Sequence, residues 1–453
     1  MCAFRSPRPG REAPGADIDR LAADIARAAR PLTDADSLDP LLDAIADARF
    51  VLLGEASHGT SEFYTWRTEI SRRLVAEKDF SFIAVEGDWP DCYRVNRYVK
   101  GYEKSGASGH DVLHAFERWP TWMWANRDVV ALTDWLRGHN ESLPNDRRVG
   151  FYGLDVYSLW ESMAAVTHYL EGVDPKLARN AKLAYACFEP YQEDVQEYAR
   201  ATALVPTSCE AEAVEILRRL RVEGREHEDI DPEAYFNAEQ NALVARNAEL
   251  YYRTMVRGGP ASWNVRDRHM FETLTRLVRH HGPNAKAIVW EHNTHIGDAR
   301  FTDMARAGML NVGQLVREAH AEDGVWLIGF GTHRGTVIAA EEWGAPMRSM
   351  RVPEARAGSY EHVMHRASSG TQSADFLLLL AERQLAGLES PRGHRAIGVV
   401  YDPRTEQWGN YVPTVLTGRY DAFLYLDETH ALDPLHMPAQ LDGEPPETWP
   451  SGF

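Results

Sequence analysis

The chain has 453 residues, of which 44% are hydrophobic and 26% charged, so it is long and apolar enough to fold without disulfides or structural metals. Asp and Glu number 67 against 49 Lys and Arg, which gives a formal net charge of −18. This acidity argues against non-specific binding to nucleic acid or to an anionic membrane surface, because both are polyanions.

The cysteines and the apolar runs indicate a soluble cytoplasmic protein. Cys2, Cys92, Cys187 and Cys209 are widely spaced and include no CxxC pair, which favours reduced thiols over a disulfide framework or a cysteine zinc site. No run approaches the 18 apolar residues of a membrane span, and the N-terminal segment lacks the apolar core of a secretory signal. We expect residues 1–17, which are rich in Pro, Gly and Arg, to form a flexible tail.

After this tail, the hydrophobic pattern predicts a series of helices and strands. Apolar residues recur at helical spacing over 18–30 and 38–48, and Phe63, Trp66 and Ile70 mark one face of a further helix. Short apolar runs of strand length follow at 48–54, 80–87, 148–155, 286–292, 324–331, 395–402 and 420–428. Their alternation with helical patterns predicts an α/β fold in which helices cover both faces of a largely parallel central sheet.

Residues 159–281 break this alternation, because they are mostly helical in pattern and poor in strand signals. We interpret them as a helical insertion or cap at the edge of the sheet, within a single domain that spans 18–453. The charged faces of these helices also fit a plain helical layer that faces solvent.

Polar residues follow four of the predicted strands. In chain order these residues are Glu55 and His58, then Glu86, then Asp155, and finally His292 and His295. Ligands in open α/β sheets bind beyond the carboxyl ends of the strands. We therefore predict that these side chains meet in one functional site.

The residue types suggest specific roles within this site. Glu55 lies three residues before His58, and a carboxylate bonded to one imidazole nitrogen makes the other nitrogen a better general base. Arg67 is on the same side of its helix as Tyr64 and Ile70, so it either reaches Glu55 or Glu86 as an ion pair or oxyanion stabiliser, or lies exposed on a solvated face.

His292 and His295 form an HxxH pair in the loop after a strand. With a neighbouring carboxylate they suit a metal site, but they also suit substrate hydrogen bonding or proton transfer. The chain has no G-x-S-x-G, G-x-G-x-x-G or Walker A sequence, which argues against a serine esterase, a dinucleotide enzyme and a P-loop enzyme.

Three other segments have both a structural and a functional interpretation. Residues 117–140 contain Trp119, Trp122, Trp124 and Trp135, which either wall a pocket for a bulky apolar ligand or fill the core, the latter being favoured for Trp135. SWNVRDRHM (262–270) places Arg266 and Asp267 near a helix start, where a structural salt-bridge network is favoured. Cys92 is expected to be a packed structural thiol.

Taken together, the motifs resemble the erythromycin esterase family. The matching pieces are LLGEASHGTSEFYTWR (52–67), IAVEGDWPDCYRVNRYV (83–99), WPTWMWANRDV (119–129), GFYGLDVYSL (150–159), SWNVRDRHM (262–270), VWEHNTHIGDAR (289–300) and DAFLYLDETH (421–430). The resemblance implies a cofactor-free hydrolase of a small-molecule ester or macrolide lactone, with antibiotic resistance as one role in the family. It implies that His58 activates water and that Glu55, Arg67, Glu86, His292 and His295 support it.

One residue departs from the pattern that the resemblance implies. Glu291 stands before HNTH where a small residue is expected, and its carboxylate is expected to shift the pKa of His292. Three other functions stay open: a metal-dependent hydrolase that uses the same histidines, a hydrolase of an unknown endogenous metabolite, and a non-catalytic protein that binds a bulky ligand. The substrate and the oligomeric state are not indicated by the sequence.

Overall fold

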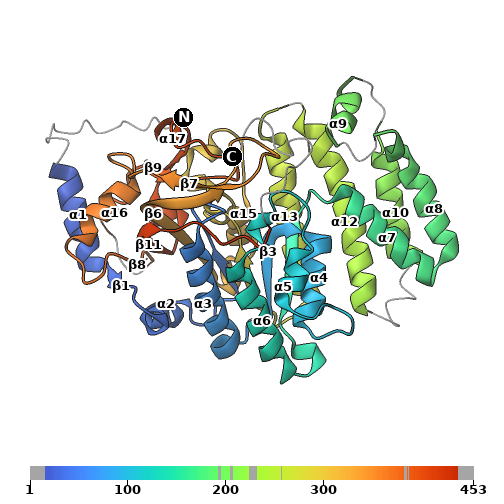
Figure 1. Cartoon of the computed structure of the whole chain (residues 1–453), viewed down its shortest axis with the longest axis horizontal. Helices are drawn as coiled ribbons and strands as arrows, with labels where there is room; N and C mark the ends of the chain where they lie inside the picture. Colours follow the sequence, from blue (N-terminus) through green and yellow to red (C-terminus); the bar gives the residue numbers. More distant parts are fainter. Residues whose placement is uncertain are drawn as a thin grey trace.

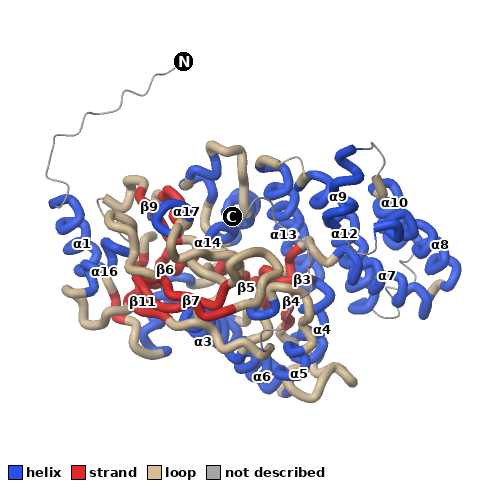
Figure 2. Tube along the Cα trace, turned by 45° about the horizontal axis from the view of Figure 1, so that its top comes forward, coloured by secondary structure: helices blue, strands red, loops and turns tan. Residues whose placement is uncertain are grey.

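A nine-stranded sheet forms the centre of the protein (Figures 1 and 2). The computed structural model describes residues 16–191, 195–204, 208–223, 232–256, 258–381, 385 and 387–436. The strand order is β1-β8-β11-β6-β2-β5-β3-β4, with β7 beside β6. The strands are β1 (Arg30–Pro31), β2 (Phe50–Leu53), β3 (Phe82–Asp88), β4 (Gly150–Asp155), β5 (Ala287–Trp290), β6 (Val325–Ala339), β7 (Arg348–Val352), β8 (Phe376–Leu379) and β11 (Ala422–Thr429).

Most of the sheet is parallel, as predicted. Every neighbouring pair from β11 to β4 is parallel, whereas β1, β7 and β8 pair antiparallel with their neighbours. The described helices are α1 (Ala16–Ala28), α2 (Asp39–Ile45), α3 (Ser61–Lys78), α4 (Trp89–Val99), α5 (Gly109–His114), α6 (Arg127–Glu141), α7 (Leu159–Val173), α8 (Pro175–Tyr185), α9 (Val195–Leu204), α10 (Glu210–Glu223), α12 (Pro232–Met255), α13 (Pro260–His281), α14 (Asn293–Ile296), α15 (Val312–Ala319), α16 (Tyr360–Ser368), α17 (Glu406–Gly409) and α18 (Leu416–Arg419).

Helices cover both faces of the sheet because successive strand residues point to opposite sides. Val51 and Leu53 of β2 belong to a buried cluster that includes side chains of α2, α3 and α6. Phe50 and Leu52 belong to a second cluster that includes side chains of α1, α13, α15 and α16. A fully buried Val, Leu or Phe side chain contributes about 1.5–3 kcal/mol, so the two clusters hold β2 firmly in the middle of the sheet.

Most of the described residues between β4 and β5 lie in helices, in keeping with the helical pattern of 159–281, and their interpretation as an insertion or cap stays a prediction. The helices α7 to α12 lie beyond the edge strand β4, at one end of the molecule in Figure 1, whereas α13 packs back against the sheet. Side chains of α7, α8, α10 and α12 form a buried cluster of their own, separate from the two clusters that flank the sheet. The placement of 18–453 in a single domain stays a prediction. Of the predicted tail, residues 1–15 lie outside the described residues, and 16–17 begin α1.

The strand predicted over 395–402 is wrong. β9 (Arg392–Arg395) instead pairs with β10 (Tyr411–Thr414) in a separate two-stranded antiparallel sheet. The following residues make only isolated bridges, from Ile397 to Ser57 and from Val400 to Ala340. Their apolar character reflects packing above the strand ends. The antiparallel strands β1, β7 and β8 were not predicted.

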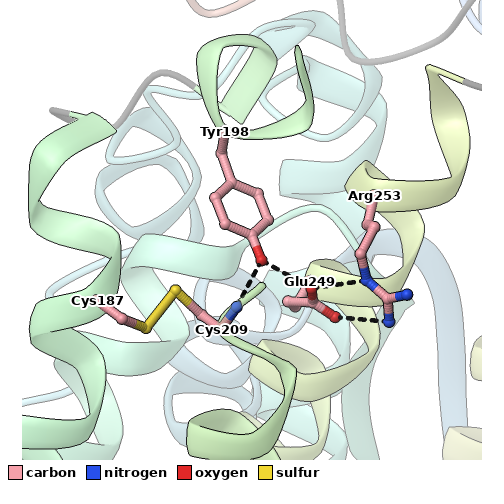
Figure 3. Close-up of a disulfide and its surroundings, with 5 residues drawn as sticks. All are labelled: Cys187, Tyr198, Cys209, Glu249 and Arg253. Carbon is pink, nitrogen blue, oxygen red and sulfur yellow. Dashed lines mark hydrogen bonds and ion pairs between the residues drawn. A yellow bond between two sulfur atoms is a disulfide. The ribbon is translucent and has the colours of Figure 1, made fainter. Parts of the chain in front are cut away.

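The expectation that the cysteines are reduced is wrong for two of them. Cys187 and Cys209 form a disulfide, with their Cα atoms 6.0 Å apart (Figure 3). The backbone N–H of Cys209 donates to the Tyr198 hydroxyl, which donates to Glu249 at 2.7 Å, and Arg253 pairs with the same carboxylate. A separation of 22 residues with no sequence motif gave no sign of this pairing. Cys92 is a buried free thiol, as expected, and burial raises its pKa well above the usual value.

No helix in the described part of the chain has the length and apolarity needed to cross a membrane.

We predict that the disulfide is present in the purified protein. Alkylation of the denatured protein without reductant, followed by peptide mass spectrometry, should recover Cys187 and Cys209 as one cross-linked peptide pair. A Cys209→Ser variant should lose the pair and about 3 kcal/mol of unfolding free energy, because an open loop of this size has more conformational entropy when unfolded. Recovery of both cysteines as alkylated thiols in the wild-type protein would contradict the assignment.

Candidate active site

Four neighbouring parallel strands bring the predicted polar residues together. Glu55 follows β2, Glu86 lies near the end of β3, Asp155 ends β4, and His292 follows β5. These strands are adjacent in the order β2-β5-β3-β4, so their carboxyl ends meet. A cavity opens above them, and its charged and imidazole-bearing lining residues are His58, Glu86, Asp88, Asp91, Arg118, Asp155, Arg266, His292 and His295.

The turn that carries His58 depends on two glycines. A Cβ on Gly54 would lie 2.1 Å from the Asn293 side chain, and one on Gly59 would lie 1.9 Å from the Ile338 carbonyl oxygen. Real Cβ atoms do not approach this closely, so no larger residue fits at either position. Because the two glycines have no side chain, the 54–59 turn packs directly against the loop after β5 and against β6.

Glu55 holds His58 and Arg67 in place. His58 Nδ1 donates to one oxygen of the Glu55 carboxylate at 2.9 Å, and an Arg67 Nη2 N–H donates to the other at 2.8 Å. His58 borders the cavity, whereas Glu55 and Arg67 lie behind it and are 1% and 0% exposed. The Arg67 guanidinium also stacks over the rings of Tyr64 and Trp290, at 4.3 and 4.7 Å from their centroids. The alternative of an exposed Arg67 is therefore wrong.

A second charged cluster borders the same cavity and is centred on Arg266 of α13. Arg266 donates from Nε and Nη2 to the two oxygens of Asp155, at 2.9 and 2.7 Å, and from Nη2 to Glu86 at 2.7 Å. The second Glu86 oxygen accepts the backbone N–H of His292 at 2.8 Å. Glu86 thus connects Arg266 to the loop that carries His292.

The two histidines of the HxxH pair have different surroundings. His292 Nδ1 accepts the Thr294 backbone N–H at 3.2 Å, which places the ring proton on Nε2, and Nε2 has no hydrogen-bond partner among the described residues. His295 Nδ1 donates to Asp267 at 2.9 Å, and its Nε2 accepts from Arg266 Nη1 at 3.1 Å. The ring of His295 also stacks on Trp263 at 4.5 Å. His292 has a donor to offer a ligand, whereas both nitrogens of His295 are occupied.

The two imidazoles of His58 and His292, which both line the cavity, have pKa values shifted in opposite directions. Burial lowers the pKa of His58, but the carboxylates of Glu86 and Glu55 outweigh burial and raise the pKa above its ordinary value of 6.5. Burial and the neighbouring His58 ring, 4.9 Å away, hold the pKa of His292 well below that value. For Glu86, the neighbouring His295 and Arg266 and the backbone N–H of His292 outweigh burial and hold its pKa far below the usual range. His58 is therefore the proton acceptor of the pair, and His292 stays neutral.

Glu291 lies under this site and does not border the cavity. It is fully buried, and neither carboxylate oxygen has a hydrogen-bond partner among the described residues. Burial and the charge of Glu86 raise its pKa well above the ordinary value, so the carboxyl is protonated. A neutral carboxyl exerts little field on His292, whose lowered pKa follows from burial and His58.

One wall of the cavity is apolar and largely aromatic. Its members are Phe116, Trp119, Pro120, Met123, Trp124, Tyr157, Trp343, Val399 and Val412. Trp119 and Trp124 therefore line the cavity, whereas Trp122 is buried in the core and Trp135 is partly buried against it. The indole N–H of Trp124 donates to the Glu86 carbonyl at 3.1 Å, which ties this wall to the charged side.

The histidines do not converge in the way that a metal site requires. In the described part of the chain, no group of three or more His, Cys, Asp or Glu side chains is arranged to hold a metal ion. The Arg266 guanidinium contacts the one nitrogen of His295 that would otherwise face His58 and Glu86. The positive charge of this guanidinium repels a metal ion and so disfavours metal binding at His295.

Sequence reasoning missed two participants of the site. Arg266 borders the cavity and Asp267 holds His295, although both were assigned to a structural salt bridge. Asp155 was expected at the strand ends but was given no role. The signal in the sequence was an Arg-Asp pair near the start of a helix whose other inward residues are mostly apolar.

Comparison with known proteins agrees with this architecture. A family model described as Erythromycin esterase matches residues 75–429. Erythromycin esterase type II of Escherichia coli is 21% identical over 348 residues, which cover 72% of this chain and 80% of that protein. The match to the family model begins after Glu55, His58 and Arg67, so the placement of these three residues rests on the geometry above.

Two solved structures share the fold. A succinoglycan biosynthesis protein superposes with a TM-score of 0.74 and 21% identity, covering 94% of this chain and 100% of its own. A variant of the erythromycin esterase EreC in its open conformation superposes with a TM-score of 0.64 and 18% identity, covering 88% and 95%. At these identities the likeness shows the fold alone.

We predict that Arg67→Met lowers the free energy of unfolding by about 3–5 kcal/mol, because it leaves the Glu55 carboxylate buried with one partner fewer. Urea unfolding measures the loss. Arg72→Met on the same helix is the matched control, because its pair with Glu69 is partly exposed to solvent and contributes about 1 kcal/mol or less.

A double variant separates the ion pair from simple packing. Glu55→Gln with Arg67→Met removes both charges, so it should be more stable than Arg67→Met alone. If the double variant loses the sum of the two single losses, the pair is not coupled and the interpretation is wrong.

Proposed function

Because the chain belongs to the erythromycin esterase family, we propose that it is a hydrolase that cleaves a carboxylic ester with water activated by His58. The observation that carries the proposal is the bond from His58 Nδ1 to Glu55 at the edge of the cavity. It fixes the tautomer whose Nε2 has a free lone pair, and Nε2 has no partner among the described residues. A histidine held in this way is suited to accept a proton from water.

The reaction starts when His58 Nε2 removes a proton from water and the water oxygen bonds to the ester carbon. The carbonyl electron pair moves to oxygen and forms a tetrahedral oxyanion. The acyl C–O bond then breaks, and the leaving alkoxide takes the proton from the His58 imidazolium. The products are an alcohol and a carboxylic acid, which loses its proton to solvent, so His58 ends in its starting state.

The other site residues support these steps. Glu55 stabilises the imidazolium that forms on His58, and Arg67 keeps Glu55 ionised and oriented from behind. The neutral His292 can donate its Nε2 proton to the oxyanion, since its Nδ1 is already an acceptor. The Glu86 carboxylate accepts the backbone N–H of His292 and so positions that loop, and His295 Nε2 accepts a hydrogen bond from Arg266. Arg67 is thus a positioning residue rather than an oxyanion donor, because it does not border the cavity.

The aromatic wall supports a bulky, mostly apolar substrate. The Escherichia coli relative is named for erythromycin, so a macrolide lactone is the first compound to test. Opening a lactone is the same reaction as ester hydrolysis, with both products left in one molecule.

We predict that metal-depleted protein converts erythromycin, or another member of a panel of hydrophobic esters and lactones, into a product heavier by one water. Mass spectrometry detects the product. His58→Ala should lower turnover on the order of 100- to 10,000-fold, which is the contribution of a general base. His110→Ala is the matched control, because this histidine is exposed.

Two results would contradict the mechanism. A folded His58→Ala variant with wild-type kcat would remove the general-base role. Activity that appears only after zinc or manganese is added back would instead identify a metal-dependent hydrolase.

We also predict the position of the acid limb of the pH profile. The base form of His58 is needed for catalysis, and its pKa is raised, so kcat/KM should fall as pH decreases through a value above 6.5. Glu86→Gln removes a negative charge that raises this pKa, and the limb should move to lower pH. A wild-type limb below 6.5, or a limb that Glu86→Gln leaves in place, would contradict the assignment of His58 as the base.

A further inference from the structure

Arg266 has one N–H donor that the protein does not use. A guanidinium carries five N–H groups. The Nε proton and both Nη2 protons bond to Asp155 and Glu86, and one Nη1 proton bonds to His295 Nε2. The second Nη1 proton therefore has no acceptor among the described residues.

This guanidinium is part of the cavity lining. Arg266 is 8% exposed and borders the same cavity as His58 and His292. Arg67, which the sequence suggested as an oxyanion stabiliser, is fully buried, pairs with Glu55 through Nη2 and does not border the cavity. Of these two arginines, Arg266 alone borders the cavity that His58 lines.

The orientation of Arg266 is fixed before any substrate enters. Asp155 accepts two hydrogen bonds from the guanidinium, and Glu86 of the neighbouring strand accepts one more. The Tyr157 ring lies 4.9 Å from the Arg266 Cζ. Donors that are already oriented stabilise a developing oxyanion with little reorganisation, and burial strengthens the interaction. A residue serving only the ion pairs with Asp155 and Glu86 would not need to border the cavity.

We propose that Arg266 is a catalytic residue that donates its remaining Nη1 proton to the ester carbonyl oxygen and stabilises the oxyanion together with His292. This assignment rests on the proposed ester hydrolysis. No proton leaves Arg266 during the reaction, because the guanidinium acts only as a hydrogen-bond donor and a fixed positive charge.

The test uses the ester or lactone that the full-length protein hydrolyses in the panel above. Arg266→Lys keeps the positive charge beside Asp155 and Glu86 but removes the planar guanidinium and its Nη1 donor. It should lower kcat on the order of 100- to 1,000-fold, the effect of one lost oxyanion donor, while KM changes little. Arg268→Ala, two residues along the same helix and exposed, is the matched control. Circular dichroism spectra of the variants, compared with that of the wild type, are the control for correct folding.

Chemical rescue separates a catalytic donor from a structural one. Added guanidinium ion should restore turnover to Arg266→Ala in a saturable manner, because the vacated position borders the cavity. It should not restore turnover to Arg67→Ala, whose position is sealed from solvent.

The outcomes distinguish this inference from the proposed function. Normal His58-dependent turnover in the wild type with an unchanged kcat in Arg266→Lys would overturn the role of Arg266 alone. Absence of His58-dependent hydrolysis in the wild type would overturn the proposed function and this inference with it.

Discussion

Glu55 connects Arg67 and His58, on which the site depends, because each of its oxygens bonds to a different one of these side chains. A buried carboxylate is stable as an anion only when charged partners replace its lost hydration. Arg67 supplies a permanent positive charge from behind, and His58 supplies an N–H at the edge of the cavity. The free Nε2 of His58 and its raised pKa both follow from this arrangement. The glycines at 54 and 59 allow the turn to pack closely enough to form it.

A second hydrogen-bonded network, centred on Arg266, fixes other residues of the cavity lining. Arg266 joins β3, β4, α13 and α14 through Glu86, Asp155 and His295, so it links four elements that are far apart in the sequence. The surplus of carboxylates around it also explains Glu291, which stays protonated because another negative charge there would be unpaired. Between the two networks, the aromatic wall offers an apolar surface to a substrate.

The features that could be predicted from the sequence are those that depend on local hydrophobic and polar patterns. The apolar runs located most of the parallel strands, and the polar residues after them lie at one edge because parallel strands share the direction of their carboxyl ends. Arg266 and Asp267 could not be placed, because only the packing of α13 against β4 brings that helix to the cavity. The 395–402 segment was misread because residues that cover a site can be as apolar as a strand. The Cys187–Cys209 bond depends on how the helices beyond β4 pack, which spacing alone does not encode.

Nitrogen-15 NMR of the histidine side chains tests the central claim most directly, with His58→Gln used to assign the His58 signals. The account predicts that neutral His58 carries its proton on Nδ1, facing Glu55, and titrates with a pKa above 6.5. Glu55→Gln should lower that pKa, because it removes the charge that favours the imidazolium. A neutral His58 that carries its proton on Nε2, or a pKa below 6.5, would show that Glu55 does not prepare His58 as a base, and the proposed mechanism would fail.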